Sequence, residues 1–307
     1  MKTKLSLLVF LIILLYTSAS VSIPKQPAID AYEVEELKNW GVEKIGAPLL
    51  WSKGIKGKGI NIAIMDSGID YNHPEFSKNI HTGYNAIQPN ELPIDDYGHG
   101  TLMTGIIAAQ HNSIGFQGIA PEAEIYPVKV LDRLGRGSLE DINRGIDWCI
   151  RHNIDIINMS FSIPEDKELL HKSIQKATNN GIIVVAAVTN SYGGAVGYPA
   201  SYEGVISVTS VDRKLDSGET ASIGKIDFSA PGEDIISTSK NGKFEYVSGT
   251  SISAPYVTGL IALLMQQYHL PSNNIVKTLK KYAEDLGVDG KDDIYGWGFL
   301  TTTENGG

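Results

Sequence analysis

Five short apolar runs, spread along the chain, constrain the fold more than any other feature. They span residues 60–65, 124–130, 155–159, 182–188 and 205–211 and are rich in valine and isoleucine. Runs of this kind predict strands that are buried on both faces, and the segments between them have the apolar spacing of helices. The sequence therefore predicts an α/β fold, in which a doubly wound, mostly parallel sheet is flanked by helices in three layers, α/β/α.

A hairpin is predicted closer to the C-terminus. Asn241 and Gly242 lie between two alternating runs in the segment DIISTSKNGKFEYVSG. An Asn-Gly pair in this setting predicts two antiparallel strands joined by a two-residue turn.

The N-terminus has the three parts of a secretory signal peptide. Lys2 and Lys4 precede an apolar run over 7–16, and small residues at 18–20 provide a cleavage site. The run is too short to cross a bilayer comfortably, so an uncleaved membrane anchor is the weaker alternative. The predicted organisation is a signal peptide at 1–20, a short N-terminal extension or propeptide at 21–38, and one domain at 39–303.

Charge and cysteine content narrow the partners and the sources of stability. The chain has a net charge of −9, and the signal peptide contains two of its 26 basic residues and none of its 35 acids, which leaves 24 against 35, or −11. An acidic protein is a poor partner for nucleic acid or anionic lipid. Cys149, the only cysteine, has the helical spacing of a core residue, so an exported chain has no internal disulfide. Packing, or a bound ion, must stabilise it.

The segment VSGTSISAPYVTG, residues 247–259, predicts an exposed serine at the start of a helix. Gly249 leaves the approach open, and Pro255 fits the first turn of a helix, so we expect Ser251 at the helix N-terminus. The free N–H groups there suit an oxyanion. A serine hydroxyl becomes a good nucleophile only beside a base. Alone, Ser251 could equally be a helix cap.

A base and a group to orient it are available elsewhere in the sequence. His99 lies between two glycines, before an apolar helical pattern that Thr101 begins. Asp66 directly follows the first predicted strand, at the end of a parallel sheet where functional residues gather. Singly, these are a turn histidine and an ordinary acid. Together with Ser251 we expect them on one rim of the sheet, in the chain order Asp, His, Ser.

The segments MDSGID, GHGT and GTSISAP resemble the three catalytic segments of the subtilisin family of serine proteases. The likeness continues through APLLWSKGIKGKG, NSIGFQGIAP, VGYPA, FSAPG and YGWGFL, and so covers almost everything after Trp40. It implies that Asp66 orients the imidazole, that His99 acts as general base and then general acid, and that Ser251 forms an acyl-enzyme. It also places an oxyanion-hole asparagine at Asn190, whose ordinary alternative is a turn cap.

The resemblance further implies that peptide substrates bind as an added strand between two segments of the chain. Ser162 and Thr189 stand where the family usually has glycine, so we expect a narrowed pocket and a preference for small or medium P1 residues. Arg136 either favours an acidic residue further upstream in the substrate or is plain surface. The substrate-binding residues that the resemblance implies are Gly135, Arg136, Gly137, Ser160, Phe161, Ser162, Ala187, Val188 and Thr189.

A structural calcium site is also implied by the resemblance. Oxygen ligands in an irregular cage suit Ca²⁺ and not zinc. Glu36 stands where the family usually has glutamine, and Glu75 where it has aspartate, so surface acids on an ordinary loop are the alternative. The implied ligands are the side chains of Glu36, Glu75 and Asn112 and the carbonyls of Gln110, Ile114 and Phe116.

The predicted function is that of a secreted, monomeric serine endopeptidase that acts on proteins or peptides. Secreted relatives usually have a folded propeptide, whereas here only residues 21–38 precede the family-like core. Either this segment blocks the active site, or folding depends on calcium and on outside help. The enzyme is a broad degrader or a dedicated precursor-processing protease. An inactive peptide-binding module and an esterase with the same triad stay open as alternatives.

Overall fold

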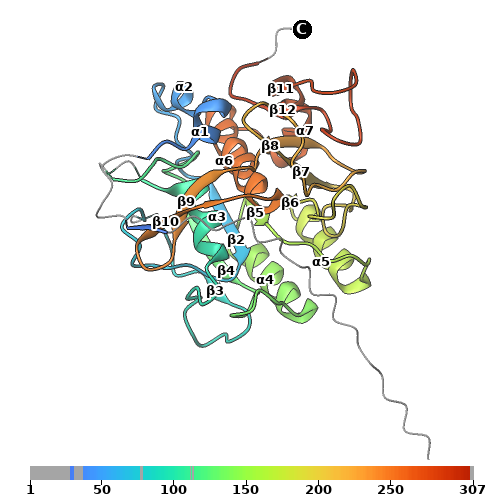
Figure 1. Cartoon of the computed structure of the whole chain (residues 1–307). Coiled ribbons are helices and arrows are strands. Elements are labelled where there is room, and N and C mark those ends of the chain that lie inside the picture. The colour runs from blue at the N-terminus through green and yellow to red at the C-terminus, as the bar shows by residue number, and fades with distance from the viewer. Residues whose placement is uncertain (1–27, 31–36, 77–78, 111, 113, 305–307) are drawn as a thin grey trace, which may run out of the picture.

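The computed structural model describes residues 28–30, 37–76, 79–110, 112 and 114–304 (Figure 1). The predicted signal peptide and most of the 21–38 extension lie outside the described residues. The helices are α1 Trp40–Ile45, α2 Ala47–Trp51, α3 His99–Ala108, α4 Leu139–Arg151, α5 Glu168–Asn179, α6 Thr250–Tyr268 and α7 Ile275–Leu279, with 3₁₀ turns at Ser272–Asn274 and Lys280–Tyr282. The strands are β1 Ile29–Asp30, β2 Asn61–Asp66, β3 Tyr84–Asn85, β4 Glu124–Lys129, β5 Ile156–Met159, β6 Ile183–Ala187, β7 Val205–Val211, β8 Phe228–Pro231, β9 Ile235–Ser239, β10 Lys243–Val247, β11 Ala283–Glu284 and β12 Phe299–Leu300.

Within these residues, nine strands form one sheet in the order β11-β12-β8-β7-β6-β5-β2-β4-β3. All neighbouring pairs are parallel except β11 with β12. The five apolar runs became β2, β4, β5, β6 and β7, and in the register Ile62 lies between Ile125 and Ile156. The doubly wound, mostly parallel sheet that the sequence predicts is therefore confirmed.

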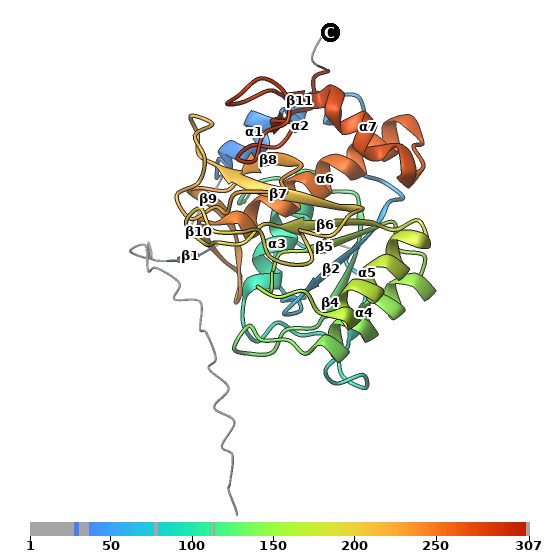
Figure 2. The ribbon, with the colours of Figure 1, turned by 90° about the vertical axis from the view of Figure 1, so that its right-hand side faces the viewer.

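Helices cover both faces of this sheet, which gives the predicted three layers. α3 and α6 pack against one face, and α4 and α5 lie side by side on the other (Figure 2). Cys149 of α4 is fully buried in the second of these cores, and burial raises the pKa of its thiol. Cys149 is thus a core residue, as its spacing predicts, and a poor nucleophile. None of the described helices has the length and apolarity needed to span a membrane.

A smaller antiparallel sheet, in the order β1-β10-β9, contains the predicted hairpin. Ser239 pairs with Lys243, so residues 240–242 form a three-residue loop and the predicted two-residue turn is wrong. Asn241 has the left-handed backbone that the Asn-Gly pair favours, with φ of 64°. Its N–H does not bond across the hairpin but donates to Asp70 Oδ2 at 2.8 Å, which ties the loop to the segment after β2.

Asn39 and Trp40, at the start of α1, are bonded to the segment between β8 and β9 and to β9 itself. Asn39 caps α1 by accepting from Gly41 N–H, and its Nδ2 donates to Ile236 O at 2.9 Å. Trp40 Nε1 donates to Glu233 O at 3.0 Å. β1 pairs antiparallel with β10, with Ile29 opposite Phe244. The N-terminal part of the described fold is therefore held by segments almost two hundred residues away, as the separation of 197 residues between Asn39 and Ile236 shows.

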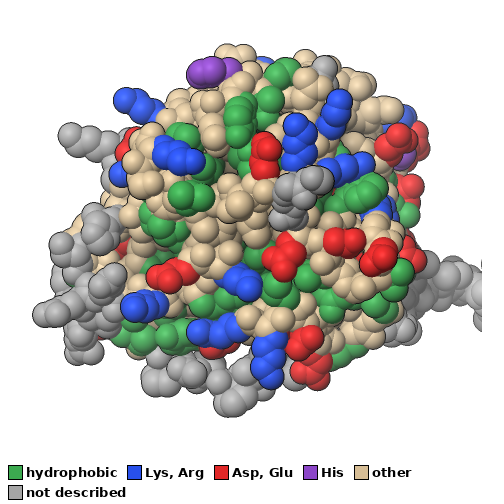
Figure 3. Space-filling view, turned by 90° about the horizontal axis from the view of Figure 1, so that it is seen from above, with side chains coloured by type: hydrophobic (Ala, Val, Ile, Leu, Met, Phe, Trp, Pro, Cys, Tyr) green, Lys and Arg blue, Asp and Glu red, His purple; other side chains and the backbone are tan. Residues whose placement is uncertain are grey.

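The face of the molecule seen from above has acidic and basic side chains interspersed among apolar ones (Figure 3). The net negative charge of the chain is therefore not gathered into a single-sign field on this face.

Candidate active site

Asp66 and His99 form a hydrogen-bonded pair at the edge of the sheet. Asp66 is the last residue of β2 and is fully buried, and His99 is the first residue of α3. His99 Nδ1 lies 2.8 Å from Asp66 Oδ2 and 3.0 Å from Oδ1, and Ser67 N–H donates to Oδ1 at 2.7 Å. Because a carboxylate only accepts, the network assigns the imidazole proton to Nδ1 and a lone pair to Nε2.

Two opposed effects set the pKa of His99. Burial lowers it, because desolvation disfavours the imidazolium, whereas the charge and hydrogen bond of Asp66, together with the charge of Asp95, raise it. The net result is a pKa above the ordinary 6.5. Since 23% of the His99 side chain remains exposed, the ring can still exchange protons with substrate or solvent.

The close approach of α3 to the segment after β2 depends on a glycine. A Cβ at Gly100 would lie 2.1 Å from Gly68 O, which no side chain could tolerate. The neighbouring Gly98 caps the helix with φ of 115°, a value that favours glycine. The two glycines around His99 therefore bring the imidazole up to Asp66.

Asp95, which the sequence analysis did not single out, holds the loop that leads into His99. Its residue is only 6% exposed, and its two carboxylate oxygens accept five hydrogen bonds. The donors to Oδ1 are Ser67 Oγ at 2.8 Å, Tyr97 N at 3.1 Å and Gly98 N at 2.6 Å, and those to Oδ2 are Thr101 N at 2.9 Å and Thr101 Oγ1 at 2.6 Å. Asp95 thus joins the segment after β2 to the start of α3.

Ser251 lies in the first turn of α6, half-buried, but Pro255 is not where the sequence predicts it. Pro255 is the sixth residue of a helix that begins at Thr250, so it lies in the second turn. Its missing N–H leaves the Ser251 carbonyl without a helical partner. Ser160 Oγ donates to that carbonyl at 2.8 Å, which explains why the proline is tolerated there.

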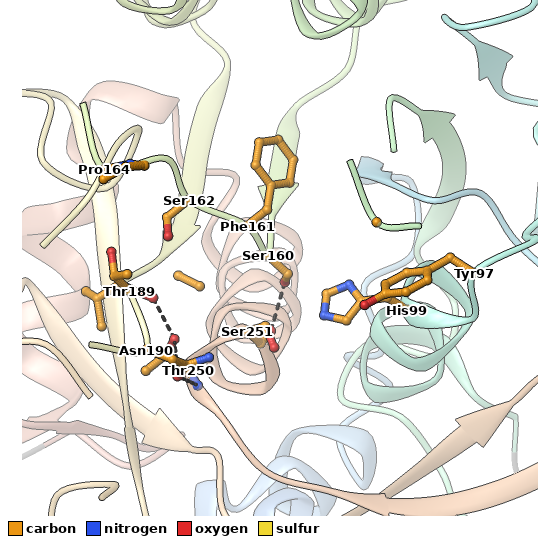
Figure 4. Close-up of a pocket in the computed structure, with 13 residues that line it drawn as sticks. Tyr97, His99, Ser160, Phe161, Ser162, Pro164, Thr189, Asn190, Thr250 and Ser251 are labelled. Atoms are coloured by element: carbon orange, nitrogen blue, oxygen red, sulfur yellow. Dashed lines mark hydrogen bonds between the residues drawn. The ribbon is translucent and has the colours of Figure 1, made fainter. Parts of the chain in front are cut away.

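Ser251 and His99 line the same pocket, and Ser251 lies between the His99 imidazole and Asn190 (Figure 4). Among the interactions of the described residues, the Ser251 hydroxyl does not yet donate a hydrogen bond to the imidazole. Such bonds are often long in the absence of substrate and shorten when it binds. Asp66 is bonded to His99, and His99 lines the same pocket as Ser251, whereas the action of the three as a catalytic triad stays a prediction.

The pocket has a volume of about 500 Å³ and contains most of the predicted substrate-binding residues. Arg136 and Gly137 are not among its lining residues, and the Arg136 guanidinium, 62% exposed, pairs with Asp132 at 3.2 Å. Sequence reasoning missed Tyr97, Pro164 and Thr250. The lining residues are Tyr97, His99, Gly135, Ser160, Phe161, Ser162, Pro164, Ala187, Val188, Thr189, Asn190, Thr250 and Ser251.

Asn190 follows β6 and presents its amide to the pocket beside Ser251 (Figure 4). Its Oδ1 accepts from Thr250 N–H at 3.1 Å. Since Thr250 is the residue before Ser251, this contact connects the amide directly to the first turn of α6. With the oxygen occupied, the Nδ2 group remains as a donor.

Ser162 and Thr189, which replace the expected glycines, both line the pocket. Thr189 Oγ1 accepts from Gly197 N–H at 2.8 Å, so this bond fixes the threonine side chain against the segment around Gly197. A Cβ added at Gly197 would lie 2.7 Å from the same oxygen, which shows how little free space remains there.

Glu75 lies near the loop predicted to bind calcium, and its surroundings fit a cation. The residue is fully buried, yet neither carboxylate oxygen has a hydrogen-bond donor of ordinary geometry among the described residues. Burial raises the pKa of Glu75 to about 8, and nearby Asn112 acts more weakly in the opposite direction. A buried carboxylate without donors needs either a proton or a cation.

Four other predicted ligands, Gln110, Asn112, Ile114 and Phe116, lie on the loop that follows α3. Gln110 N–H donates to Glu75 O at 3.0 Å, and Asn112 Nδ2 donates to Pro74 O at 2.9 Å, so the segments of Glu75 and Asn112 run side by side. Ile114 and Phe116 follow on this loop, while Glu36 lies outside the described residues. The described residues contain no cluster of three or more His, Cys, Asp or Glu side chains suited to a metal, so carbonyl and amide oxygens would have to supply most ligands.

Comparison with known proteins agrees with this geometry. The profile of the Subtilase family matches residues 57–298. The minor extracellular protease Epr of Bacillus subtilis is 39% identical over 269 residues, and subtilisin NAT of Bacillus subtilis subsp. natto is 38% identical over 264. These matches cover 87% and 84% of this chain, which spans 41% of the length of Epr and 69% of subtilisin NAT.

An intracellular serine protease of Paenibacillus polymyxa is 36% identical over 298 residues, which is 92% of this chain and 91% of that protein. The similar proteins thus include an extracellular and an intracellular one by name, and all three are proteases. The chain therefore belongs to the subtilase family of serine endopeptidases, as the resemblance of its sequence motifs indicates.

Proposed function

We propose that this endopeptidase cleaves peptide bonds through an acyl-enzyme, with Asp66, His99 and Ser251 as its triad and Asn190 as its oxyanion donor. One observation carries the proposal. The His99 imidazole is fixed by Asp66 in the tautomer that leaves Nε2 free, inside the pocket that Ser251 also lines. That arrangement is what removal of a proton from a serine hydroxyl requires.

The proposed steps use only these groups. His99 Nε2 takes the Ser251 hydroxyl proton as Oγ attacks the substrate carbonyl, and the negative oxygen is received by Asn190 Nδ2 and the Ser251 N–H. His99 then gives its proton to the leaving amine, and water repeats the sequence to release the acid. Loss of an oxyanion-hole donor of this type costs roughly 10²–10³ in turnover, a magnitude measured on a subtilisin and carried over from it.

We assign a selective substrate preference to this enzyme, with small or medium P1 residues. Support comes from Ser162 and Thr189, whose side chains line the pocket, and from the fixed position of the Thr189 hydroxyl. A narrowed pocket suits a dedicated processing protease better than a broad degrader, because it excludes the large P1 residues that many proteins offer. Main-chain pairing along the substrate would provide affinity with little sequence choice.

Export and calcium binding complete the proposal. The basic and apolar N-terminal pattern supports export, and the extracellular relative Epr is consistent with it. Glu75, Asn112 and the carbonyls of Gln110, Ile114 and Phe116 would hold Ca²⁺, with Glu36 as a further ligand. The buried Glu75 carboxylate without donors supports this assignment. When bound, the ion would supply stability and take no part in the reaction.

The decisive experiment combines a fluorophosphonate probe with casein digestion, before and after Ser251→Ala. We expect the wild type to be labelled and to digest casein, and the variant to do neither. Labelling without digestion would support the esterase alternative, and absence of labelling in a folded wild type would support a peptide-binding module. The N-terminus of the secreted protein, determined by mass spectrometry, would test export and show whether a second cleavage follows.

A further inference from the structure

Among the described residues, the side-chain oxygen of Asn190 has three potential hydrogen-bond donors. Two of them belong to Thr250 of α6, and the third comes from another segment. Thr250 N–H and Thr250 Oγ1 each lie 3.1 Å from Asn190 Oδ1, and Thr220 Oγ1 lies 2.9 Å from it. Thr220 belongs to the connection between β7 and β8, far from α6 in the chain. A separate segment therefore reaches the amide that faces the pocket.

The Thr250 hydroxyl has a better acceptor than Asn190. It lies 2.5 Å from Val188 O, against 3.1 Å from Asn190 Oδ1, and a hydroxyl has only one proton to donate. The proton therefore goes to Val188 O. Two true donors remain for the two lone pairs of Asn190 Oδ1, namely the Thr250 N–H and the Thr220 hydroxyl.

This arrangement decides which end of the amide faces the substrate. An asparagine amide can turn about its terminal torsion, and the two orientations have nearly the same shape. In one orientation Nδ2 faces the developing oxyanion, and in the other Oδ1 would repel it. If the Thr250 N–H were the sole donor to Oδ1, the amide would turn more freely. Asn190 is exposed, so water could then bind either of its polar atoms in both orientations.

Thr220 is itself held in place by the backbone. Ala221 and Asn190 form an antiparallel bridge, Tyr192 N–H donates to Thr220 O at 2.9 Å, and Ser222 N–H donates to Thr189 O at 3.0 Å. The segment of Thr220 thus runs along the segment of Asn190, and the hydroxyl has little freedom to leave.

We propose that Thr220 is a positioning residue, whose hydroxyl fixes the Asn190 amide with Nδ2 toward the oxyanion. The inference rests on the proposed function, because it gives Thr220 a role only through Asn190. The oriented Asn190 amide stabilises the oxyanion of the transition state more than it stabilises the bound substrate. Loss of the Thr220 hydroxyl should therefore lower kcat and leave KM nearly unchanged.

The test compares Thr220→Val, which keeps the shape and removes the hydroxyl, with Thr220→Ser, which keeps the hydroxyl. For the loss of one net hydrogen bond we expect kcat of Thr220→Val to fall about three- to tenfold with KM nearly unchanged, and Thr220→Ser to stay close to wild type. Rates are divided by the concentration of active sites, titrated with the fluorophosphonate, so misfolded molecules do not count. Thr178→Val is the matched control, since Thr178 is also half-buried and donates its hydroxyl to a protein oxygen, Gln175 O at 3.1 Å.

A double-mutant cycle separates positioning from general damage. In an Asn190→Ala background, Thr220→Val should cost no more than about twofold, because no amide is left to orient. The proposal is overturned if Thr220→Val leaves kcat unchanged, raises KM alone, or lowers kcat by the same factor with and without Asn190. The proposed function fails by a different result, in which Asn190→Ala or Ser251→Ala leaves proteolysis intact.

Discussion

Replacement of Asp95 by asparagine is the sharpest test of how the His99 loop is held. The substitution keeps the shape of the side chain but changes one accepting oxygen into an NH₂ group. If Oδ2 is the atom replaced, the N–H and hydroxyl of Thr101, a fully buried residue, lose their acceptor, and the N–H then faces another donor. The three hydrogen bonds to Oδ1 remain, but they become weaker because their acceptor is then a neutral amide oxygen and no longer a carboxylate.

The expected cost follows from these contacts. A buried donor left without a partner costs about 1–3 kcal/mol, and the loss of charge assistance at the remaining bonds adds to it, so we expect the free energy of unfolding to fall by about 3 kcal/mol. At about 3 °C per kcal/mol for a chain of this size, the Tm should fall by about 9 °C. Melting is measured in a Ser251→Ala background, at one scan rate, so that self-digestion does not contribute.

The same change should shift the pH dependence of activity. The general base must be neutral, so activity rises as the pH increases through the pKa of His99. The charge of Asp95 helps to raise that pKa, so Asp95→Asn should move the acid limb of kcat/KM to lower pH. Glu122→Gln is the control, because the Glu122 carboxylate forms an ion pair with Lys56 at 3.6 Å at the surface, away from His99. A variant that melts within about 2 °C of the parent and keeps the same acid limb would refute the role given to Asp95.

Three further results are expected. If calcium is present at a hundred times its Kd, its removal with a chelator should lower the Tm by about 5–10 °C. In Glu75→Gln the chelator should leave the Tm unchanged. An unchanged Tm in the wild type would contradict the calcium site. Ser162→Gly with Thr189→Gly should widen the pocket and move the P1 preference in a peptide library toward Phe and Tyr, whereas a wild type that already prefers Phe or Tyr would rule out the narrowing. Activity should survive dilute peroxide, because Ile252 next to the nucleophile cannot be oxidised, and Ile252→Met should make it sensitive; rapid loss in the wild type would contradict this.

The sheet could be predicted from the sequence because each central strand has its own local signal. Runs such as Ile183–Ala187 are apolar throughout and are buried at every position, as expected for a strand covered on both faces. Pro255 shows where local rules stop. Its place in the second turn of α6 depends on Ser160, which lies 91 positions before Ser251 and donates to the Ser251 carbonyl that the proline leaves free. No pattern around Pro255 could indicate that partner.

The candidate site divides in the same way. Asp66 directly follows a predicted strand, and His99 and Ser251 stand at the starts of predicted helices. Their places at the ends of these elements were enough to predict that the three side chains lie close together. Asp95 and Thr220 could not, because their roles depend on which loops lie against each other in three dimensions. Arg136 stays open between its two interpretations, since its guanidinium pairs with Asp132 and does not line the pocket, and its contact with a substrate stays a prediction.

The bonds from Asn39 and Trp40 to residues 236 and 233 limit the order in which the chain can fold during synthesis. The amino-terminal segment leaves the ribosome early, but its acceptors appear only after most of the polypeptide has been translated. Until then the segment cannot form its native hydrogen bonds, and contacts between residues so distant in the chain form slowly. A truncated product that ends before β9 should therefore stay protease-sensitive at its amino-terminal end, whatever the state of the strands already made.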